Sequence, residues 1–408
     1  MTFSCGDRIR IYANKEAMYF FDRETGDLME LDENERKLVR RNGINRVLNI
    51  YKNTLLNKQQ KTSLEPAMLT FTIETTSSCN LQCVYCYQRD KGSRAEMSDS
   101  TADKTCDFIE RCAALRGNCG INLNLIGGEP LLGMHVIRRI MSRLNESIGG
   151  GVFVHVDTNG CLPLRELSEL CEHLEVIICL SLPNDHNKYR YSAGHDTTRR
   201  IINNIKNADW SGDRHVELRY NTHDGNVDDF SQFLDWIDDL RNNPVESVIP
   251  EKIDNYNYNV NFYNAMTDVQ FGHWVGSKAL DELLLRGWPV EIKLSTPLYA
   301  LCQGHQFFSS KIYADGAVTI CDAMLRNEAR CNINDIYNDP NKINQIYSDI
   351  KSVDPLNCAD CQLCVGLSAC GGRKWCYHGG CDTLSVEKQK TTIDTVVWHH
   401  LKALPVES

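Results

Sequence analysis

Cysteine residues gather in two places along this 408-residue chain, and their spacing limits what the chain can fold into. Of the 19 cysteines, three stand in the segment CNLQCVYC as Cys79, Cys83 and Cys86, and nine lie between Cys302 and Cys381. A chain of this length buries a core without covalent cross-links, so a disulfide scaffold is not expected. The two groups therefore indicate metal or redox chemistry, and the other seven cysteines are interpreted as small buried hydrophobic side chains.

Composition narrows the class of protein. The chain is 42% hydrophobic and 24% charged, which is typical of a globular protein and excludes global disorder, collagen and coiled coil. Its net charge of −10 argues against a nucleic-acid partner, because few basic side chains are left to neutralise phosphates. The N-terminus has no apolar signal region, and no apolar run approaches membrane-spanning length. We expect a cytoplasmic protein with no membrane partner.

Strand and helix patterns alternate from Met68 onward. The strand candidates are Leu69–Glu74, Ile121–Ile126, Val152–Val156, Val176–Leu182, Val216–Tyr220 and Val260–Tyr263. Helical patterns occur at about 99–115, 134–146, 164–174, 197–207 and 227–241, and again at Ser277–Arg286. This order predicts an α/β fold with a parallel sheet, in which six units form a partial (β/α)6 barrel. In such folds the active site lies at the carboxyl ends of the strands.

The first cysteine group follows the first strand with the spacing C-x3-C-x2-C. Three thiolates on one loop can hold a [4Fe–4S] cluster by three irons and leave the fourth iron open. A structural zinc site takes four protein ligands, so three suit zinc only in a catalytic role. With Tyr85 before the last cysteine, the segment resembles the signature of the radical S-adenosylmethionine (SAM) superfamily.

Further motifs strengthen this resemblance. Gly127-Gly128-Glu129-Pro130 resembles the superfamily's GGEP motif, and Thr158-Asn159-Gly160 resembles its TNG motif. Ser181 ends the fourth strand, and Arg190 ends the segment HNKYR. The resemblance implies that these segments bind SAM, through Tyr85, Gly127, Gly128, Glu129, Asn159, Ser181 and Arg190. Many relatives have Asp-Gly two residues after the serine, but this chain has Pro183-Asn184 there, so a contact made by that aspartate is not carried over.

The second group reads C302-x13-G316-x4-C321 and then C358-x2-C361-x2-C364-x5-C370-x5-C376-x4-C381. This layout resembles the SPASM extension of radical SAM enzymes, although its last two intervals differ from that pattern. The resemblance implies one auxiliary [4Fe–4S] cluster on Cys361, Cys364, Cys370 and Cys381. It implies another on Cys302, Cys321 and Cys376, with Cys358 or Cys331 as a fourth ligand, or with an open iron. A single auxiliary cluster, or a zinc ion, is the alternative.

Asp322 directly follows Cys321. The same Cys-Asp pair occurs in anaerobic sulfatase-maturating enzymes, and this resemblance implies that Asp322 is a general base near the substrate. A carboxylate beside a buried cluster could have a pKa suited to accepting a proton. A hydrogen-bonded structural aspartate is the alternative.

The N-terminal residues 1–64 predict a small separate module. Alternating runs at Arg8–Ile11, Ala17–Phe21 and Leu28–Leu31 indicate strands, Asp32 is a candidate helix N-cap, and Ile44–Leu56 is a candidate helix. The module resembles the winged-helix element that binds the leader of a ribosomal precursor peptide by adding it as a strand. A plain N-terminal cap on the barrel is the alternative.

Three domains are therefore expected: the module 1–64, a radical SAM barrel 65–290 and a SPASM domain 291–408. Together the resemblances imply three [4Fe–4S] clusters, SAM, and an electron donor such as flavodoxin or ferredoxin. They imply radical cross-linking of a precursor peptide that is bound through its leader, with closure of a cyclophane C–C or a thioether bond. The alternatives are a formylglycine-forming sulfatase-maturating enzyme and a non-catalytic iron–sulfur or zinc scaffold.

Overall fold

The computed structural model describes residues 2–5, 9–13, 18–22, 28–31, 33, 36–37, 68–86, 94–192, 196–241, 243–253, 265–288, 308–322 and 324–351. The chain divides into two compact units. One unit contains Met1–Pro66, Ile292–Gln306 and Ser352–Ser408, and the other contains Ala67–Glu291 and Phe307–Lys351.

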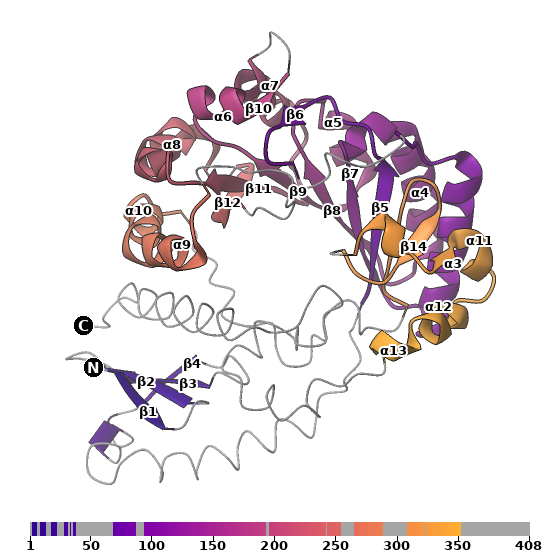
Figure 1. Cartoon of the computed structure of the whole chain (residues 1–408), viewed down its shortest axis with the longest axis horizontal. Helices are drawn as coiled ribbons and strands as arrows, with labels where there is room; N and C mark the ends of the chain where they lie inside the picture. The colour runs from indigo at the N-terminus through magenta and orange to yellow at the C-terminus, as the bar shows by residue number, and fades with distance from the viewer. Residues whose placement is uncertain are drawn as a thin grey trace. The chain divides into compact units, whose positions relative to one another are not determined.

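The described part of the first unit is a four-stranded antiparallel sheet. Its strands follow the chain order β1 (Thr2–Cys5), β2 (Ile9–Ala13), β3 (Met18–Asp22) and β4 (Leu28–Glu30) (Figure 1). Three of these strands correspond to the predicted alternating runs, and β1 is an additional strand. The N-cap predicted at Asp32 and the helix predicted at 44–56 lie outside the described residues.

The second unit is built on a nine-stranded sheet with the order β12-β11-β9-β8-β7-β5-β13-β14-β15. Pairing is parallel from β12 through β5 to β13, while β14 and β15 pair antiparallel. The strands are β5 (Leu69–Thr76), β7 (Ile121–Gly127), β8 (Val152–Thr158), β9 (His173–Cys179), β11 (Asp213–Thr222), β12 (Val245–Lys252), β13 (Ser310–Ile312), β14 (Ala317–Thr319) and β15 (Cys331–Asn332).

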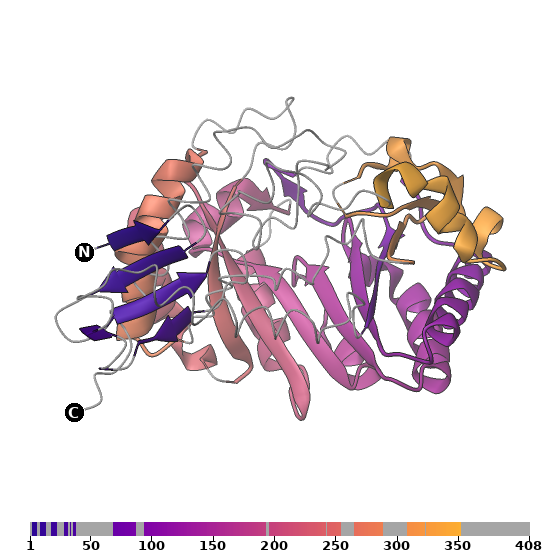
Figure 2. The same cartoon turned by 90° about the horizontal axis from the view of Figure 1, so that it is seen from below.

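Helices connect the parallel strands and cover one face of this sheet, as Figures 1 and 2 show. They are α3 (Asp99–Leu115), α4 (Met134–Ser147), α5 (Arg165–Leu170), α6 (Pro183–Tyr189), α7 (Thr197–Lys206) and α8 (Phe230–Trp236). The Ser98 side chain caps α3 by accepting a hydrogen bond from Thr101 N at 3.1 Å. Each long helix packs an apolar stripe against the sheet, as Ile137, Ile140 and Leu144 of α4 do. This arrangement confirms the predicted α/β fold with a parallel sheet.

The two faces of the sheet differ in chemistry. In β8 the side chains of Val152, Val154 and Val156 are buried, whereas those of His155 and Asp157, at the alternate positions, are more exposed. Successive side chains of a strand point to opposite faces, so the helix-covered face is apolar and the other face carries polar and charged groups. We call the second face the inner face.

The sequence analysis missed the sixth parallel strand. It is β12 (Val245–Lys252), and two prolines obscured the strand pattern: Pro244 directly before the strand and Pro250 within it. An edge strand tolerates proline because one row of its N–H groups has no ladder partner. The strand predicted at Val260–Tyr263 lies outside the described residues, as do residues 289–307.

Three other predicted elements have different limits. The fourth predicted strand begins earlier, as β9, so the preceding helix α5 is short. The predicted helix 227–241 is α8 flanked by 3-10 turns. The predicted helix 277–286 is the end of a longer one, made of α9 (Asp268–Trp274), a π-helical turn and α10 (Leu280–Leu285).

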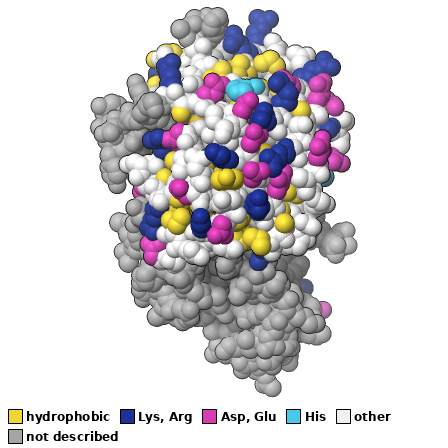
Figure 3. Space-filling view, turned by 90° about the vertical axis from the view of Figure 1, so that its right-hand side faces the viewer, with side chains coloured by type: hydrophobic (Ala, Val, Ile, Leu, Met, Phe, Trp, Pro, Cys, Tyr) yellow, Lys and Arg dark blue, Asp and Glu magenta, His cyan; other side chains and the backbone are white. Residues whose placement is uncertain are grey.

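Acidic and basic side chains are interspersed on the face that carries α3 and α4 (Figure 3). Arg143 bonds both Asp107 and Glu110, and Arg139 bonds Asp103. Exposed pairs of this kind contribute little stability individually, and they describe a solvated outer surface. Among the described residues, no helix is both long and apolar enough to cross a membrane.

Glu175, His155 and His215 form a group of ionisable side chains on the inner face, and this group predicts how the thermal stability of the protein depends on pH. Glu175 Oε2 lies 2.5 Å from His155 Nδ1, and Glu175 Oε1 lies 3.5 Å from His215 Nε2. Hydrogen bonds from both histidines lower the pKa of Glu175, and its hydrogen bond raises the pKa of His215. A raised histidine pKa contributes stability that is present in mild acid and is lost as pH rises through the folded-state pKa.

Raising the pH from 6 to 8.5 should therefore lower the thermal midpoint of the wild type more than that of Glu175→Gln. We expect a difference of about 1–3 °C between the two shifts, because only the wild type loses the charged pair. Differential scanning fluorimetry across this range measures it. Equal shifts in both proteins would contradict the prediction.

Candidate functional site

The predicted motifs meet at one edge of the sheet. The segments that follow β5, β7, β8 and β9 carry the cysteine loop, GGEP, TNG and Ser181, in that order. Because these strands are parallel neighbours, their carboxyl ends lie at the same edge. This is the edge at which α/β folds of this kind bind ligands.

The cysteine loop is tied to a distant segment through its backbone. The short strand β6 (Gln82–Cys83) pairs antiparallel with β10 (Arg190–Tyr191), so that Cys83 lies directly opposite Arg190. Val84 N donates to Tyr189 O at 2.8 Å next to this pair. The predicted cluster ligand and the predicted anion-binding arginine are therefore held side by side.

Cys83 and Cys86 of the loop are half-buried, whereas Cys79 is exposed. Burial raises the pKa of Cys79 and of Cys83, and the charge of Arg190 opposes this shift at Cys83. Among the described residues, no three His, Cys, Asp or Glu side chains are grouped closely enough to hold a single metal ion. Three thiols spread along one loop suit a polynuclear iron–sulfur cluster, which is wider than one ion. Cys79, Cys83 and Cys86 therefore fit the group that the sequence implies.

Gly127 and Gly128 allow the end of β7 to approach the start of the cysteine loop. A Cβ on Gly127 would lie 2.3 Å from Thr76 O, and one on Gly128 would lie 2.3 Å from Ser78 O. In the same place Gly128 N donates to Thr76 O at 2.9 Å. Only residues without a side chain permit this contact.

Gly128→Ala should therefore displace residues 77–79 and reduce the iron bound after anaerobic reconstitution by about fivefold or more. Gly149→Ala is the matched control, because nothing lies within 4 Å of its added Cβ. Colorimetric iron and sulfide assays measure the effect. Equal iron content in the two variants would show that the contact is not required.

Glu129 joins the ends of two strands. Its Oε1 accepts from Thr158 Oγ1 at 2.6 Å and from Leu131 N at 3.1 Å, and its Oε2 accepts from Asn159 N at 2.8 Å. The side chain is fully buried. Burial raises the pKa of Glu129, and these three hydrogen bonds oppose the shift. The carboxylate thus holds the GGEP and TNG segments together.

Asn159 connects the TNG segment to the cysteine loop. Its Nδ2 donates to Asn80 Oδ1 at 2.7 Å and approaches Cys79 Sγ at 3.8 Å. Its Oδ1 accepts from Cys161 N at 2.9 Å, which fixes the orientation of the amide. Asn159 therefore supports the loop from the side of β8.

Arg190 and Tyr85 lie together behind the cysteine loop. Burial raises the pKa of Tyr85 to about 12, and Asn221 Nδ2 donates to its hydroxyl at 3.0 Å. Arg190 Nε is buried and has no hydrogen-bond partner among the described residues. An unpaired guanidinium nitrogen is suited to an anionic ligand such as a carboxylate.

Ser181 belongs to a network that the sequence analysis did not find. The Ser181 side chain and His223 both hydrogen-bond to Asp185, with His223 Nε2 lying 2.8 Å from Asp185 Oδ1. Gly225 N donates to His223 Nδ1 at 3.0 Å, so this ring nitrogen carries no proton and is not available as a base. The trio has the composition of a hydrolytic triad, but its hydrogen bonds make it structural. Asp185, four residues after Ser181, was not predicted, because relatives carry their aspartate two residues after the serine and this chain has Pro183 there.

Cys321 and Asp322 follow the hairpin of β13 and β14. Lys311 Nζ donates to the backbone oxygen of Asp322 at 2.8 Å, and the Asp322 side chain is exposed. Cys331 lies on β15, where burial raises its pKa to about 12. The other predicted auxiliary ligands, Cys302, Cys358, Cys361, Cys364, Cys370, Cys376 and Cys381, lie outside the described residues.

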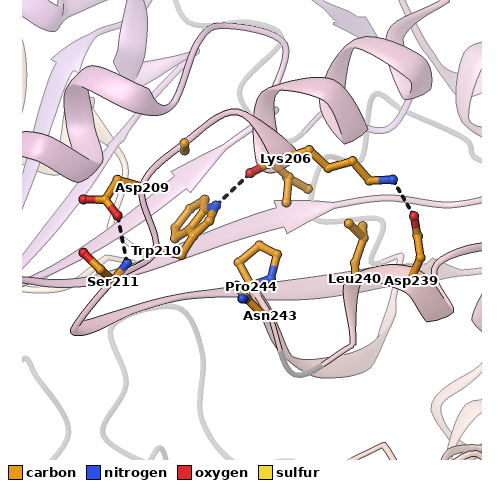
Figure 4. Close-up of a pocket in the computed structure, with 10 residues that line it drawn as sticks. Lys206, Asp209, Trp210, Ser211, Asp239, Leu240, Asn243 and Pro244 are labelled. Carbon is orange, nitrogen blue, oxygen red and sulfur yellow. Dashed lines mark hydrogen bonds and ion pairs between the residues drawn. The ribbon is translucent and has the colours of Figure 1, made fainter.

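A hollow of about 600 Å³ lies at the opposite edge of the sheet, between the loops that precede β11 and β12 (Figure 4). Trp210, Leu240 and Pro244 line it, together with an ion pair between Lys206 and Asp239. Trp210 Nε1 donates to Ile205 O at 2.7 Å, so its polar atom is already bonded. The hollow is remote from the motifs, and its lining does not suggest a reaction.

Comparison with known proteins finds a family match over part of the chain. Residues 73–237 match the model of the radical SAM superfamily. The pyruvate formate-lyase-activating enzyme of Staphylococcus aureus is 27% identical over 187 residues, which cover 43% of this chain and 72% of that protein. An uncharacterized protein of Methanocaldococcus jannaschii is 27% identical over 111 residues, or 27% of this chain and 37% of that protein. The chain thus spans about two fifths of the length of the archaeal relatives it matches.

Two solved structures share the fold. The structure of anSMEcpe with bound AdoMet has a TM-score of 0.61 at 15% identity, covering 83% of this chain and 94% of that chain. Streptococcus suis SuiB bound to the precursor peptide SuiA has a TM-score of 0.51 at 14% identity, covering 93% and 95%. At these identities the likeness concerns the fold.

Proposed function

We propose that this chain is a radical SAM enzyme that acts on a ribosomally made precursor peptide and installs a side-chain cross-link, as a cyclophane C–C or a thioether bond. The observation that carries the proposal is the β6–β10 pairing. It places a cysteine of the predicted cluster loop opposite an arginine whose buried Nε is unpaired. The pairing supports a cluster and the carboxylate of SAM binding next to each other at this edge of the sheet.

The chain's own residues would hold the cofactors as follows. Cys79, Cys83 and Cys86 would ligate a [4Fe–4S] cluster, and Arg190 would bind the carboxylate of SAM. Gly127 and Gly128 bring the end of β7 against the loop, and Glu129 fixes the neighbouring TNG segment. When bound, these cofactors supply a 5′-deoxyadenosyl radical that abstracts hydrogen from an unactivated carbon. The protein positions the substrate and excludes water.

A peptide substrate is supported by two observations. Solved structures with this fold carry peptides, namely anSMEcpe with the Cp18Cys peptide and SuiB with SuiA. The N-terminal sheet has β1 and β4 as its edge strands, and an edge strand can accept a leader peptide as an added strand. We propose that residues 1–64 bind the leader, that 65–290 form the barrel and that 291–408 hold two auxiliary clusters.

Asp322 is proposed as the base that takes a proton from the substrate. Its exposed side chain follows Cys321, in the unit that also contains the cysteine loop. An electron donor such as flavodoxin or ferredoxin would reduce the SAM-binding cluster. The described residues contain no observation that favours formylglycine formation. A non-catalytic scaffold would not need an arginine with a buried, unbonded Nε beside the cysteines.

Anaerobic reconstitution with iron, sulfide, SAM and dithionite tests the first step. We expect 5′-deoxyadenosine to form, and its absence would refute the proposal that the chain is a radical SAM enzyme. Co-expression with short precursors encoded by neighbouring reading frames tests the second step. A mass loss of two hydrogens per cross-link supports the proposal, whereas an unchanged mass indicates epimerisation or no reaction.

A further inference from the structure

One guanidinium on the inner face is shared by three carboxylates. Arg219 Nε lies 2.9 Å from Glu217 Oε1, while its Nη1 lies 3.4 Å from Glu251 Oε2 and 3.9 Å from Asp157 Oδ1. Glu217 is buried, but the side chain of Asp157 is 53% exposed. A single positive charge therefore leaves this group with excess negative charge.

Asp157 is the least satisfied of the carboxylates. Among the described residues, its only polar partner is Arg219, at a distance too long for a good hydrogen bond. The other two carboxylates of the group lie closer to the same guanidinium, Glu217 at 2.9 Å and Glu251 at 3.4 Å. The Asp157 carboxylate is thus free to accept hydrogen bonds from a ligand.

Asp157 lies at the carboxyl end of β8, directly before the TNG segment. It precedes Thr158, which bonds Glu129, and Asn159, whose amide contacts Cys79 Sγ. Its side chain lies on the inner face, like that of His155 on the same strand. A ligand that contacts Asp157 would therefore bind at the carboxyl end of β8, the end of the strand that carries the TNG segment.

The charges around Asp157 indicate what kind of ligand fits. Desolvation raises the pKa of Asp157, Arg219 lowers it, and Glu251, Asp322 and Glu217 raise it again. Cys179 on the neighbouring strand β9 has a raised pKa as well, chiefly through burial, and Asp157 adds to the shift. A cation placed here would relieve the repulsion among the carboxylates, whereas an anion would add to it.

We propose that Asp157 is a specificity-determining residue that binds a lysine or arginine side chain of the peptide substrate next to the reacting position. Arg219 is a positioning residue that holds the Asp157 carboxylate from one side and leaves its other side open. Glu251, paired with the same guanidinium, adds negative charge from β12. This inference names the class of substrate side chain and rests on the proposed function.

Selection from a peptide library tests the inference. The probe is a pool of biotinylated peptides with five randomised central positions, presented to the anaerobically reconstituted full chain with SAM. We expect lysine and arginine to be enriched about 5- to 10-fold over glutamine and methionine among the retained peptides. Asp157→Asn should reduce this enrichment to less than about twofold, because the neutral amide keeps the shape and loses the charge.

Two further variants control for structural damage. Asp157→Glu keeps the charge and should keep most of the enrichment. Asp239→Asn removes an acidic group that pairs with Lys206 at the opposite edge of the sheet, and it should change nothing. Unchanged enrichment in Asp157→Asn, or no preference for basic residues in the wild type, would overturn the inference.

The result is separable from the proposed function. If no 5′-deoxyadenosine forms but basic peptides are selected through Asp157, the radical function fails and the binding inference stands. If 5′-deoxyadenosine forms and the wild type selects peptides without regard to charge, the function stands and the inference fails.

Discussion

Cys83→Ala protein should bind no SAM-cleaving cluster and should form 5′-deoxyadenosine about 1,000-fold more slowly than the wild type, or not at all. Each of the three loop thiolates is expected to hold one iron, so the loss of one leaves a site with too few protein ligands. Cys83 is the most informative of the three because it pairs with Arg190 across the β6–β10 ladder. Alanine preserves the backbone of this ladder, which separates the loss of the thiol from the loss of the pairing.

Cys119→Ala is the matched control. Cys119 is half-buried and lies just before β7, at the edge of the sheet away from the loop. Iron and sulfide content, electron paramagnetic resonance of the reduced protein and chromatography of 5′-deoxyadenosine measure both variants. Full activity in Cys83→Ala, or an equal loss in Cys119→Ala, would contradict the assignment.

Glu129→Ala should lower the free energy of unfolding of the unit that contains the nine-stranded sheet by about 3–5 kcal/mol, even without cofactors. The substitution leaves Thr158 Oγ1, Leu131 N and Asn159 N without their acceptor in a fully buried place. Glu129→Gln should destabilise the protein less than Glu129→Ala. Its amide oxygen still accepts hydrogen bonds on one side, and only the side that faces its NH2 group loses an acceptor. Urea unfolding of the apoprotein, followed by circular dichroism, ranks the variants.

Glu169→Ala controls for the loss of a glutamate from the surface. Its side chain is 54% exposed and pairs with Arg165 one helical turn away on α5. We expect a change within about 0.5 kcal/mol. Similar losses in Glu129→Ala and Glu169→Ala would show that Glu129 is not a structural hub.

The repeating units of the barrel could be predicted because each has its own local pattern. Helix α3 was predicted with its exact limits, since Ser98 caps it and its apolar residues recur at helical spacing. Strand β12 could not be found this way. Its prolines oppose strand formation locally, and only its pairing with β11 in the folded sheet stabilises it.

The candidate site divides in a similar manner. The cysteines and the glycines could be proposed as site residues because each group forms a short motif within a few consecutive residues. The acceptor role of Glu129 and the bonds of Asp185 depend on groups about 30 to 40 residues away, which no local pattern reveals. The same holds for Asp157, whose environment exists only after β8, β11 and β12 are aligned.

The pairing of β6 with β10 also bears on how such a chain can evolve. Tyr191 and Gln82 are 109 positions apart in sequence, yet their side chains bond at 3.0 Å within a ladder of two residue pairs. Because β10 directly follows α6, a mutation that shifts α6 should move the cysteine loop as well, so the proposed cluster site and the proposed SAM-carboxylate site should change together. We therefore expect sequence variation among chains with this ladder to accumulate on the inner face, at positions such as Asp157 that lie outside the ladder.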